Sequence, residues 1–158
     1  MSYSQPKTIS QLNLSNTLPI SLPGAALTPL IWQDDTGIAP DPKYFNVVLP
    51  TSDITINFNC RIRISASVAI TRGGGGGPTD FALQLFRDQG VGFALVQWVT
   101  QPSELRGNGS PQSQSFDTFI DANAGDVFRV TEIRAGGSAM ATVFPRQAMV
   151  TFDIVNLL

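Results

Sequence analysis

The sequence predicts an all-β domain of two packed sheets, and three observations support that fold class. First, residues 60–72, CRIRISASVAITR, place apolar side chains at the even positions from Cys60 to Ile70 and mostly polar ones between them. This period of two indicates a strand with one buried face and one face that is wet or in an interface. Second, shorter alternating stretches recur along the chain with turns between them. Third, no stretch shows a convincing apolar period of 3.6, so about eight to ten strands are expected in a sandwich or barrel.

Composition limits what such a domain can do. The chain has 158 residues, enough for one domain with a real core. Hydrophobic residues make up 42% of it and charged residues only 14%, against about 25% in an average soluble domain. Much of the surface is therefore neutral and polar. Such a surface suits a protein that packs against neighbours, and an ordinary polar β domain is the equally weighted alternative.

Charge and hydropathy argue against two classes of partner. The formal net charge is −2 and the few basic residues are scattered, so no clustered basic face for nucleic acid is visible. No apolar run approaches the roughly 18–20 residues that a membrane span needs. The opening residues, MSYSQPKTIS, lack a basic segment followed by an apolar one, so we expect no secretory signal and synthesis in the host cytoplasm.

The reactive side chains are few. Cys60 is the only cysteine, so an intrachain disulfide is impossible, and its place on the apolar face predicts a small buried hydrophobe. Histidine is absent, which removes the usual general base, the Ser-His and Cys-His pairs and the commonest zinc ligand. We therefore expect no catalytic site, no cofactor and no resident metal.

Residues 1–33 differ from the rest of the chain. They carry one charge, Lys7, and four prolines, which forbid a helix and discourage a central strand. They are also too apolar for a solvated linker. We predict an extended apolar arm at residues 1–33, lying on a partner or on its own domain, and a β-sandwich or barrel domain at residues 34–158. The candidate partner-binding side chains of the arm are Ile9, Leu12, Leu14, Leu18, Ile20, Leu22 and Trp32.

The remaining strands follow from alternation and from turn residues. Residues 91–100, VGFALVQWVT, are apolar on both faces, which predicts a strand covered on both sides. The glycine run at 73–77 and the polar stretch at 101–115 are predicted to be exposed loop tips. The other predicted strands cover residues 44–49, 54–58, 81–88, 116–121, 127–134, 138–144 and 148–158.

Two groups of acidic side chains have a chemical alternative. Asp34, Asp35 and Asp41 crowd oxygen ligands into one loop and can bind calcium, but a solvated turn is the favoured interpretation. Asp117 and Asp121 share a strand face and resemble a glycosidase pair, although two exposed acids beside a turn are far commoner.

The two tryptophans offer a flat face for a sugar ring. Trp98 falls within an apolar strand and is predicted to be core. Trp32 is the better candidate for an interface anchor. No motif in the sequence otherwise supports glycan binding.

Three stretches of the second half of the chain carry a shared pattern. The long strand at 60–72 is followed by a loop and FALQLFRD; residues 124–130, AGDVFRV, open a long strand with a Gly-Asp pair; and residues 148–158 alternate to an apolar end. Over roughly residues 54–158 this pattern resembles the complement globular-head and tumour-necrosis-factor-like domains. The resemblance implies a jelly roll of about ten strands that forms a trimer about an axis.

The sequence departs from the animal members of that family. It lacks their tyrosines, their collagen-like stalk and a signal peptide, and has the proline-rich segment instead. These departures favour a virus or phage structural protein. The leading hypothesis is a non-enzymatic, homotrimeric capsid decoration (cement) protein of a bacteriophage, bound to the major capsid protein or another virion protein on the virion surface through its arm. The alternative is a receptor- or glycan-binding head of a phage tail fibre.

Overall fold

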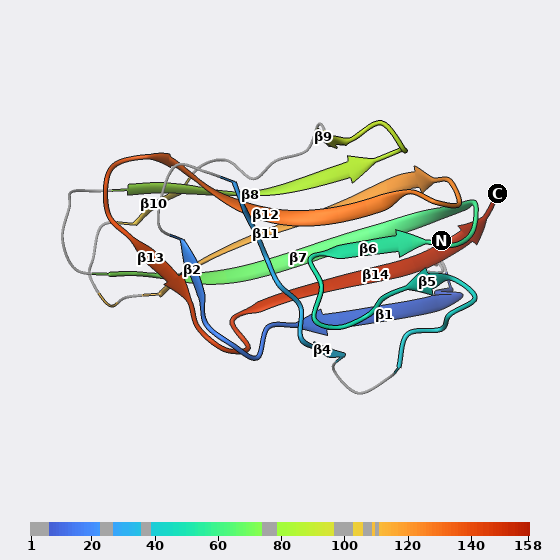
Figure 1. The fold of residues 1–158 in the computed structure, drawn as a ribbon, viewed down its shortest axis with the longest axis horizontal. Helices are drawn as coiled ribbons and strands as arrows, with labels where there is room; N and C mark the ends of the chain where they lie inside the picture. Colours follow the sequence, from blue (N-terminus) through green and yellow to red (C-terminus); the bar gives the residue numbers. More distant parts are fainter. Residues whose placement is uncertain are drawn as a thin grey trace, which may run out of the picture.

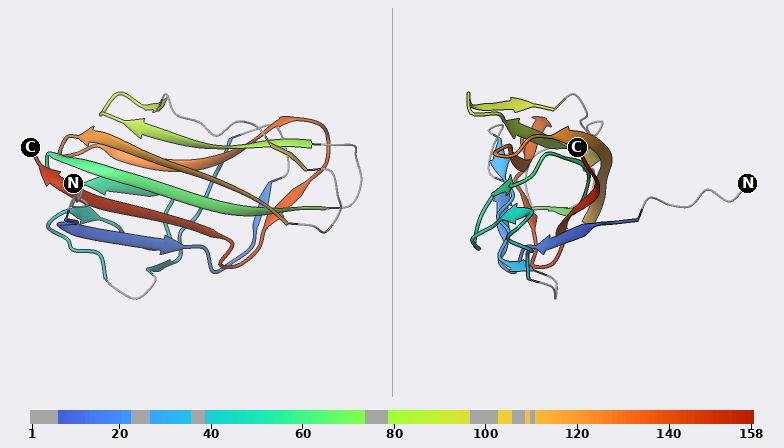
Figure 2. Two further views of the ribbon diagram at one scale, coloured as in Figure 1. Left: turned by 180° about the vertical axis from the view of Figure 1, so that it is seen from behind. Right: turned by 90° about the vertical axis from the view of Figure 1, so that its right-hand side faces the viewer.

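Two antiparallel β-sheets pack face to face in a computed structural model of the chain (Figure 1). The structure describes residues 7–22, 27–35, 39–73, 79–96, 103–105, 109 and 111–158. Every regular element among these residues is a strand, which confirms the predicted all-β sandwich. Seen from the end, the two sheets form the walls of one continuous core (Figure 2).

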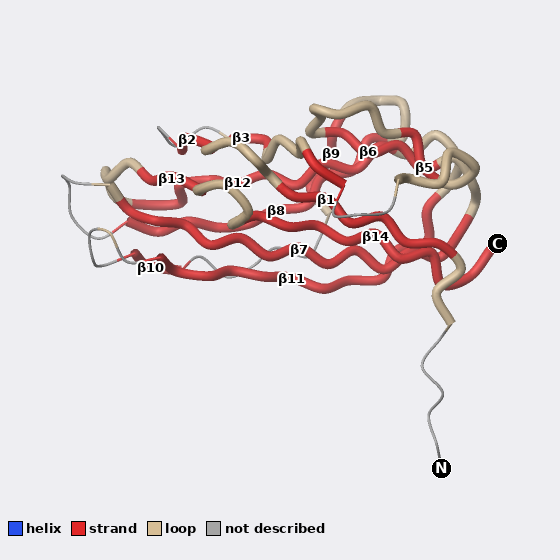
Figure 3. Tube along the Cα trace, turned by 90° about the horizontal axis from the view of Figure 1, so that it is seen from below, coloured by secondary structure: helices blue, strands red, loops and turns tan. Residues whose placement is uncertain are grey.

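The first sheet, sheet A, is built on the long strand that the sequence singled out. Its order is β2-β13-β7-β14-β1-β4, and β11 pairs with the opposite edge of β7 (Figure 3). The strands of sheet A are β1 (Ser10–Ser15), β2 (Ile20–Leu22), β4 (Asp34–Asp35), β7 (Cys60–Arg72), β11 (Pro111–Ala122), β13 (Ala141–Val143) and β14 (Ala148–Leu157).

The second sheet, sheet B, is centred on β8 and β12, which pair over almost their whole length. Its order is β10-β8-β12-β6-β5, with β9 beside β8 and β3 beside β12. The strands of sheet B are β3 (Thr28–Pro29), β5 (Phe45–Asn46), β6 (Asp53–Ile56), β8 (Thr79–Asp88), β9 (Phe93–Leu95), β10 (Ser103–Leu105) and β12 (Val127–Gly136).

The core confirms the period-two pattern of β7. The even positions from Cys60 to Ile70 are all buried between the sheets, while the odd positions lie on the outer face. The Cys60 thiol is fully buried, as predicted, and this burial raises its pKa to about 11. Interior packing of this kind makes the thiol inert.

The N-terminal segment is part of the sandwich. β1 pairs with β14 along its whole length, and Leu12, Leu14, Ile20, Leu22 and Trp32 are buried in the core. The prediction of a separate arm over residues 1–33 is therefore wrong for the described part of that segment. Its two described prolines are compatible with the strands, because Pro19 lies between β1 and β2 and Pro29 lies on the two-residue edge strand β3.

Two of the seven arm candidates remain accessible. The side chains of Ile9 and Leu18 are exposed, on either side of β1. They are the candidates from this segment that can still meet a partner. The other five stabilise the domain itself, since burying each apolar side chain contributes about 1.5–3 kcal/mol.

The region around β9 also differs from its prediction. Only Phe93–Leu95 is a strand within the described residues 91–96, and the Val91 side chain is 95% exposed. The carboxylate of Asp88 accepts hydrogen bonds from the backbone N–H groups of Gly90, Val91 and Gly92, and both glycines have positive φ. This turn ends β8 and separates it from β9. The prediction that residues 91–100 form one strand covered on both sides is therefore wrong for the described residues. Trp98 lies outside them.

The polar stretch at 101–115 contains more structure than its composition suggested. β10 pairs with β8, and β11 begins at Pro111, paired with Thr71 of β7. The prediction of a loop extending to Ser115 is wrong at its end, because backbone pairing with β7 needs no apolar side chain. Of the glycine run at 73–77, only Gly73 lies within the described residues.

Candidate interaction surface

β11 forms an unusually long edge of sheet A. It has 12 residues, whereas β4, β5 and β10 at the other ends of the two sheets have two or three. Natural proteins protect long edges with lysines, prolines or bulges. β11 has no lysine, has proline only at its first residue, and pairs with β7 without a bulge. No described strand covers its other edge, so this edge is open to a partner.

Small polar side chains line the outer face of sheet A beside that edge. The strand register places Asn13, Thr151, Ser65 and Asp117 in one row across four strands. Above the middle of the sheet lies a shallow hollow of about 400 Å³. Its lining consists of Ser65, Ala66, Ser67, Ser115, Phe116, Asp117, Met149 and Thr151.

Hydrogen bonds hold much of this polar face in place. The Gln11 side-chain amide donates to Asp153 Oδ1 at 2.6 Å, and Asn13 donates to Gln11 Oε1 at 3.1 Å. The Thr151 hydroxyl donates to Asn13 Oδ1 at 2.7 Å. A face fixed in this way loses little conformational entropy when a partner binds.

Two arginines of β7 neutralise the acidic residues of β11. Arg63 donates from Nε to Asp117 Oδ1 at 2.9 Å and from Nη2 to Oδ2 at 2.5 Å, and this contact holds the pKa of Asp117 below its usual value. Arg61 Nη1 lies 4.0 Å from Asp121 Oδ1. Each carboxylate therefore has its own arginine, which supports the interpretation of Asp117 and Asp121 as exposed acids.

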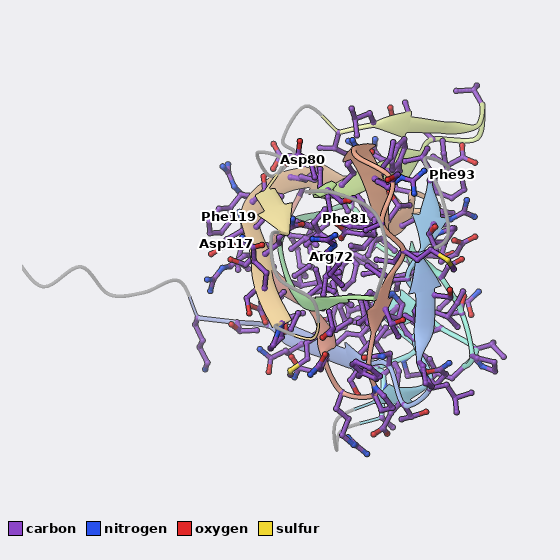
Figure 4. All side chains as sticks on the ribbon, turned by 90° about the vertical axis from the view of Figure 1, so that its left-hand side faces the viewer. Arg72, Asp80, Phe81, Phe93, Asp117 and Phe119 are labelled. Carbon is purple, nitrogen blue, oxygen red and sulfur yellow. The ribbon has the colours of Figure 1, made fainter. Side chains whose placement is uncertain are left out.

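Two apolar side chains stand out on the same face. Met149 of β14 lines the hollow, and Phe119 of β11 lies under the Arg61 guanidinium, 6.0 Å from the ring centroid. Both are nearly half exposed. Figure 4 shows Asp117 and Phe119 on the outer side of β11, whereas Arg72 and Phe81 lie inside the sandwich. A neutral face with isolated apolar anchors is typical of a protein interface.

The other predicted sites do not assemble. Asp34 Oδ2 lies 3.1 Å from Arg146 Nη2, and Asp41 Oδ1 accepts the Lys43 N–H at 2.9 Å. Trp32 is fully buried and so cannot anchor an interface. Among the described residues, no three His, Cys, Asp or Glu side chains gather as a metal site. None of the described elements is a helix long and apolar enough to cross a bilayer.

A smaller hollow lies near the C-terminus. It measures about 230 Å³ and is lined by Asn57, Phe58, Asn59, Ala124 and Leu158. The Lys43 ammonium lies 4.9 Å from the ring centroid of Tyr44, which packs edge-on against Phe58. Sequence reasoning did not identify this hollow, because residues far apart in the chain form it.

Known proteins resemble this chain in structure. No protein-family model matches the sequence, and no curated protein matches it significantly. The structure of Eiger TNF from S. frugiperda aligns with a TM-score of 0.62 at 10% identity, covering 94% of this chain and 93% of that one. Murine APRIL gives 0.63 at 10% identity, covering 91% and 97%. The globular domain of zebrafish complement 1qA gives 0.62 at 9% identity, covering 96% and 100%. The chain therefore has the jelly-roll sandwich fold that these tumour-necrosis-factor-like and complement globular-head proteins share.

Proposed function

We propose that the chain is a non-enzymatic assembly domain that forms a homotrimer through sheet A. The observation that carries the proposal is the long open edge of β11 beside a neutral, hydrogen-bonded face with two apolar anchors. An edge on one subunit and a face on the next make a heterologous contact, and three such contacts form a closed ring when each relates its subunits by a third of a turn. The family resemblance implies the same stoichiometry.

We further propose that this trimer is a capsid decoration protein on the surface of a bacteriophage virion. The low charge fraction supports a role packed against neighbouring subunits. The proposed partner is the major capsid protein or another virion protein. Five of the predicted arm side chains are buried in the core and cannot contact a shell. We therefore propose that exposed side chains such as Ile9 and Leu18 make the contact.

The trimer is tested by native mass spectrometry and sedimentation of the purified chain. The wild type is expected at three times 17.0 kDa. Phe119→Asp and Met149→Asp should give monomers, because each places a charge in the proposed contact. The matched control is Val91→Asp on the exposed β9 turn, which should remain trimeric. A wild-type chain that stays monomeric at micromolar concentration would overturn the trimer.

The virion role needs a separate measurement. Purified trimer is mixed with undecorated phage capsids, and co-sedimentation is measured. Binding is expected for the wild type and should weaken for Leu18→Asp, with Val48→Asp, at a still more exposed position, as the control. Failure of trimers to bind any shell would remove the decoration role and leave the trimer intact.

The hollow near the C-terminus favours the second candidate function. An exposed aromatic edge flanked by two asparagine amides offers the apolar and polar contacts that a sugar needs. A receptor- or glycan-binding head of a tail fibre would use this end. Binding on a bacterial glycan array that is lost in Phe58→Ala would support it, and an array without signal would exclude glycans as its target.

A further inference from the structure

Glu132 is a buried acid without a partner. Its side chain is 1% exposed and points between the sheets, on the same side of β12 as Phe128 and Val130. Neither carboxyl oxygen has a hydrogen-bond partner among the described residues. An unpaired ionised carboxyl in such a place is strongly unfavourable, so the group takes its neutral, protonated form.

Within the described part of the chain, no cation hydrogen-bonds to this carboxyl. The neighbouring strand β8 places Phe81, Leu83 and Leu85 on the same interior side, and β2 of the opposite sheet contributes Ile20 and Leu22. The charged groups on the interior side nearby are Arg134, whose Nη1 bonds to the Ala139 carbonyl, and Arg72 at the end of β7. Neither arginine donates a hydrogen bond to the Glu132 carboxyl oxygens. Burial raises the pKa of this carboxyl to about 8.

The weakest cover over Glu132 is β3. On one side Glu132 pairs with Leu83 in the long β8–β12 ladder, and on the other with Thr28 of β3. β3 has only two residues, pairs at Thr131 and Glu132, and is continued by one hydrogen bond from Leu30 N to the Val130 carbonyl at 2.9 Å. The Thr28 side chain, in register with Glu132, is half-buried, so water reaches this side of the Glu132 position.

We infer that β3 is a strap that stays closed over neutral Glu132 and opens when this carboxyl ionises. Loss of the proton creates a buried charge, and the chain relieves it most easily by releasing the two-residue strap rather than the ten-residue β8. β3 belongs to sheet B, whereas β2 and β4, which precede and follow it in the chain, belong to sheet A. Its release therefore detaches from sheet B the segment that connects these two strands. This device is independent of the trimer.

Hydrogen exchange tests the strap. Amide exchange in residues 27–33 is measured from about pH 6 to about pH 9 and corrected for the intrinsic rate. In the wild type, opening of this segment should rise about tenfold for each pH unit up to the Glu132 pKa of about 8 and level off above it. Glu132→Gln should remove the rise, and Asp121→Asn, which alters an exposed acid, should retain it.

A second measurement uses the unmodified protein. The side-chain carboxyl carbon of Glu132 is followed by NMR across the same range, and it should titrate well above 4.5, the value for an unperturbed glutamate. Titration near that ordinary value would overturn the inference. So would a rise in exchange that is equal in Glu132→Gln, or one that spreads evenly along β8 and β12 instead of residues 27–33.

Discussion

Two acidic residues close together in the chain, Asp126 and Glu132, are almost equally buried and have opposite environments. Asp126, just before β12, is 3% exposed and accepts hydrogen bonds from Arg87 Nε at 3.0 Å and from the Asn123 N–H at 2.7 Å. A second Arg87 nitrogen, Nη2, also contacts it. Glu132, in the middle of β12, has no such donor among the described residues. Burial alone therefore does not decide what a carboxyl contributes; its donors do.

The paired acid organises the end of the sandwich. Gly125, with a φ of 95°, turns the chain, and its N–H bonds to the Ile56 carbonyl. Asp126 then ties the turn to β8 through Arg87, which also donates to the Asp121 carbonyl. This gives a physical reason for the Gly-Asp pair in the sequence. The unpaired acid, by contrast, is expected to make the stability of the domain depend on pH.

The largest expected effect comes from breaking the paired acid. Asp126→Ala leaves Arg87 and the Asn123 N–H without their acceptor, so the free energy of unfolding should fall by about 3–5 kcal/mol. Urea unfolding measures it. Asp121→Ala, which removes an exposed acid near the end of β11, should cost far less. Equal losses in the two variants would contradict the organising role of Asp126.

The unpaired acid should act with the opposite sign. Because the pKa of Glu132 is raised to about 8 from 4.5, the native state keeps a proton that the unfolded chain loses between those values. Its contribution to stability is complete below about pH 4.5 and falls by roughly 1.4 kcal/mol per pH unit up to about pH 8. Urea unfolding of Glu132→Gln should show a flatter pH profile, and parallel profiles for variant and wild type would refute this.

Alternation explains which parts of the fold could be predicted. It identified β7 and β14, where one face is apolar over a long stretch. Leu12 and Leu14 show the same period in β1, but their neighbouring prolines outweighed it. The prediction for residues 91–96 was wrong for the opposite reason. Their apolar composition suggested burial, but the turn held by Asp88 keeps Val91 exposed. Side-chain period encodes a buried face better than composition does.

The interaction surface was only half predictable. The polar odd positions of β7 indicated a wet or interfacial face, which the structure has. The row from Asn13 to Asp117 depends on the register between strands distant in sequence, and no local pattern reports it. Glu132 did carry a signal, because it continues the inward alternation of Phe128 and Val130.

Asp53 of β6 and Arg129 of β12 form a pair that is less buried than Asp126 and Arg87, so its loss should reduce stability by less. Asp53 accepts hydrogen bonds from Arg129 at 2.7 and 2.8 Å, and the guanidinium lies 3.9 Å from the Phe93 ring centroid. Asp53→Asn should cost about 1 kcal/mol. Because Arg129 lowers the pKa of Asp53, this stability is present above about pH 4 and lost as the pH falls through the native value, which is the reverse of Glu132. Acid titration followed by circular dichroism should show a smaller acid-dependent loss in the variant, and an unchanged profile would contradict it.

The smallest expected effect belongs to the exposed pair on the outer face of sheet A. Asp117 and Arg63 are paired through two hydrogen bonds, but both side chains are more than 40% exposed. Water and salt screen such a pair, so Asp117→Asn should change monomer stability by about 0.5 kcal/mol or less, and less still in high salt. The pKa of Asp117 is lowered by Arg63, so any contribution is present above pH 3.8 and lost as the pH falls further.

Urea unfolding at low and high salt measures the effect of Asp117→Asn on stability. A salt-independent loss as large as that of Asp126→Ala would mean that this pair is already buried, as it would be inside a trimer that persists during the measurement.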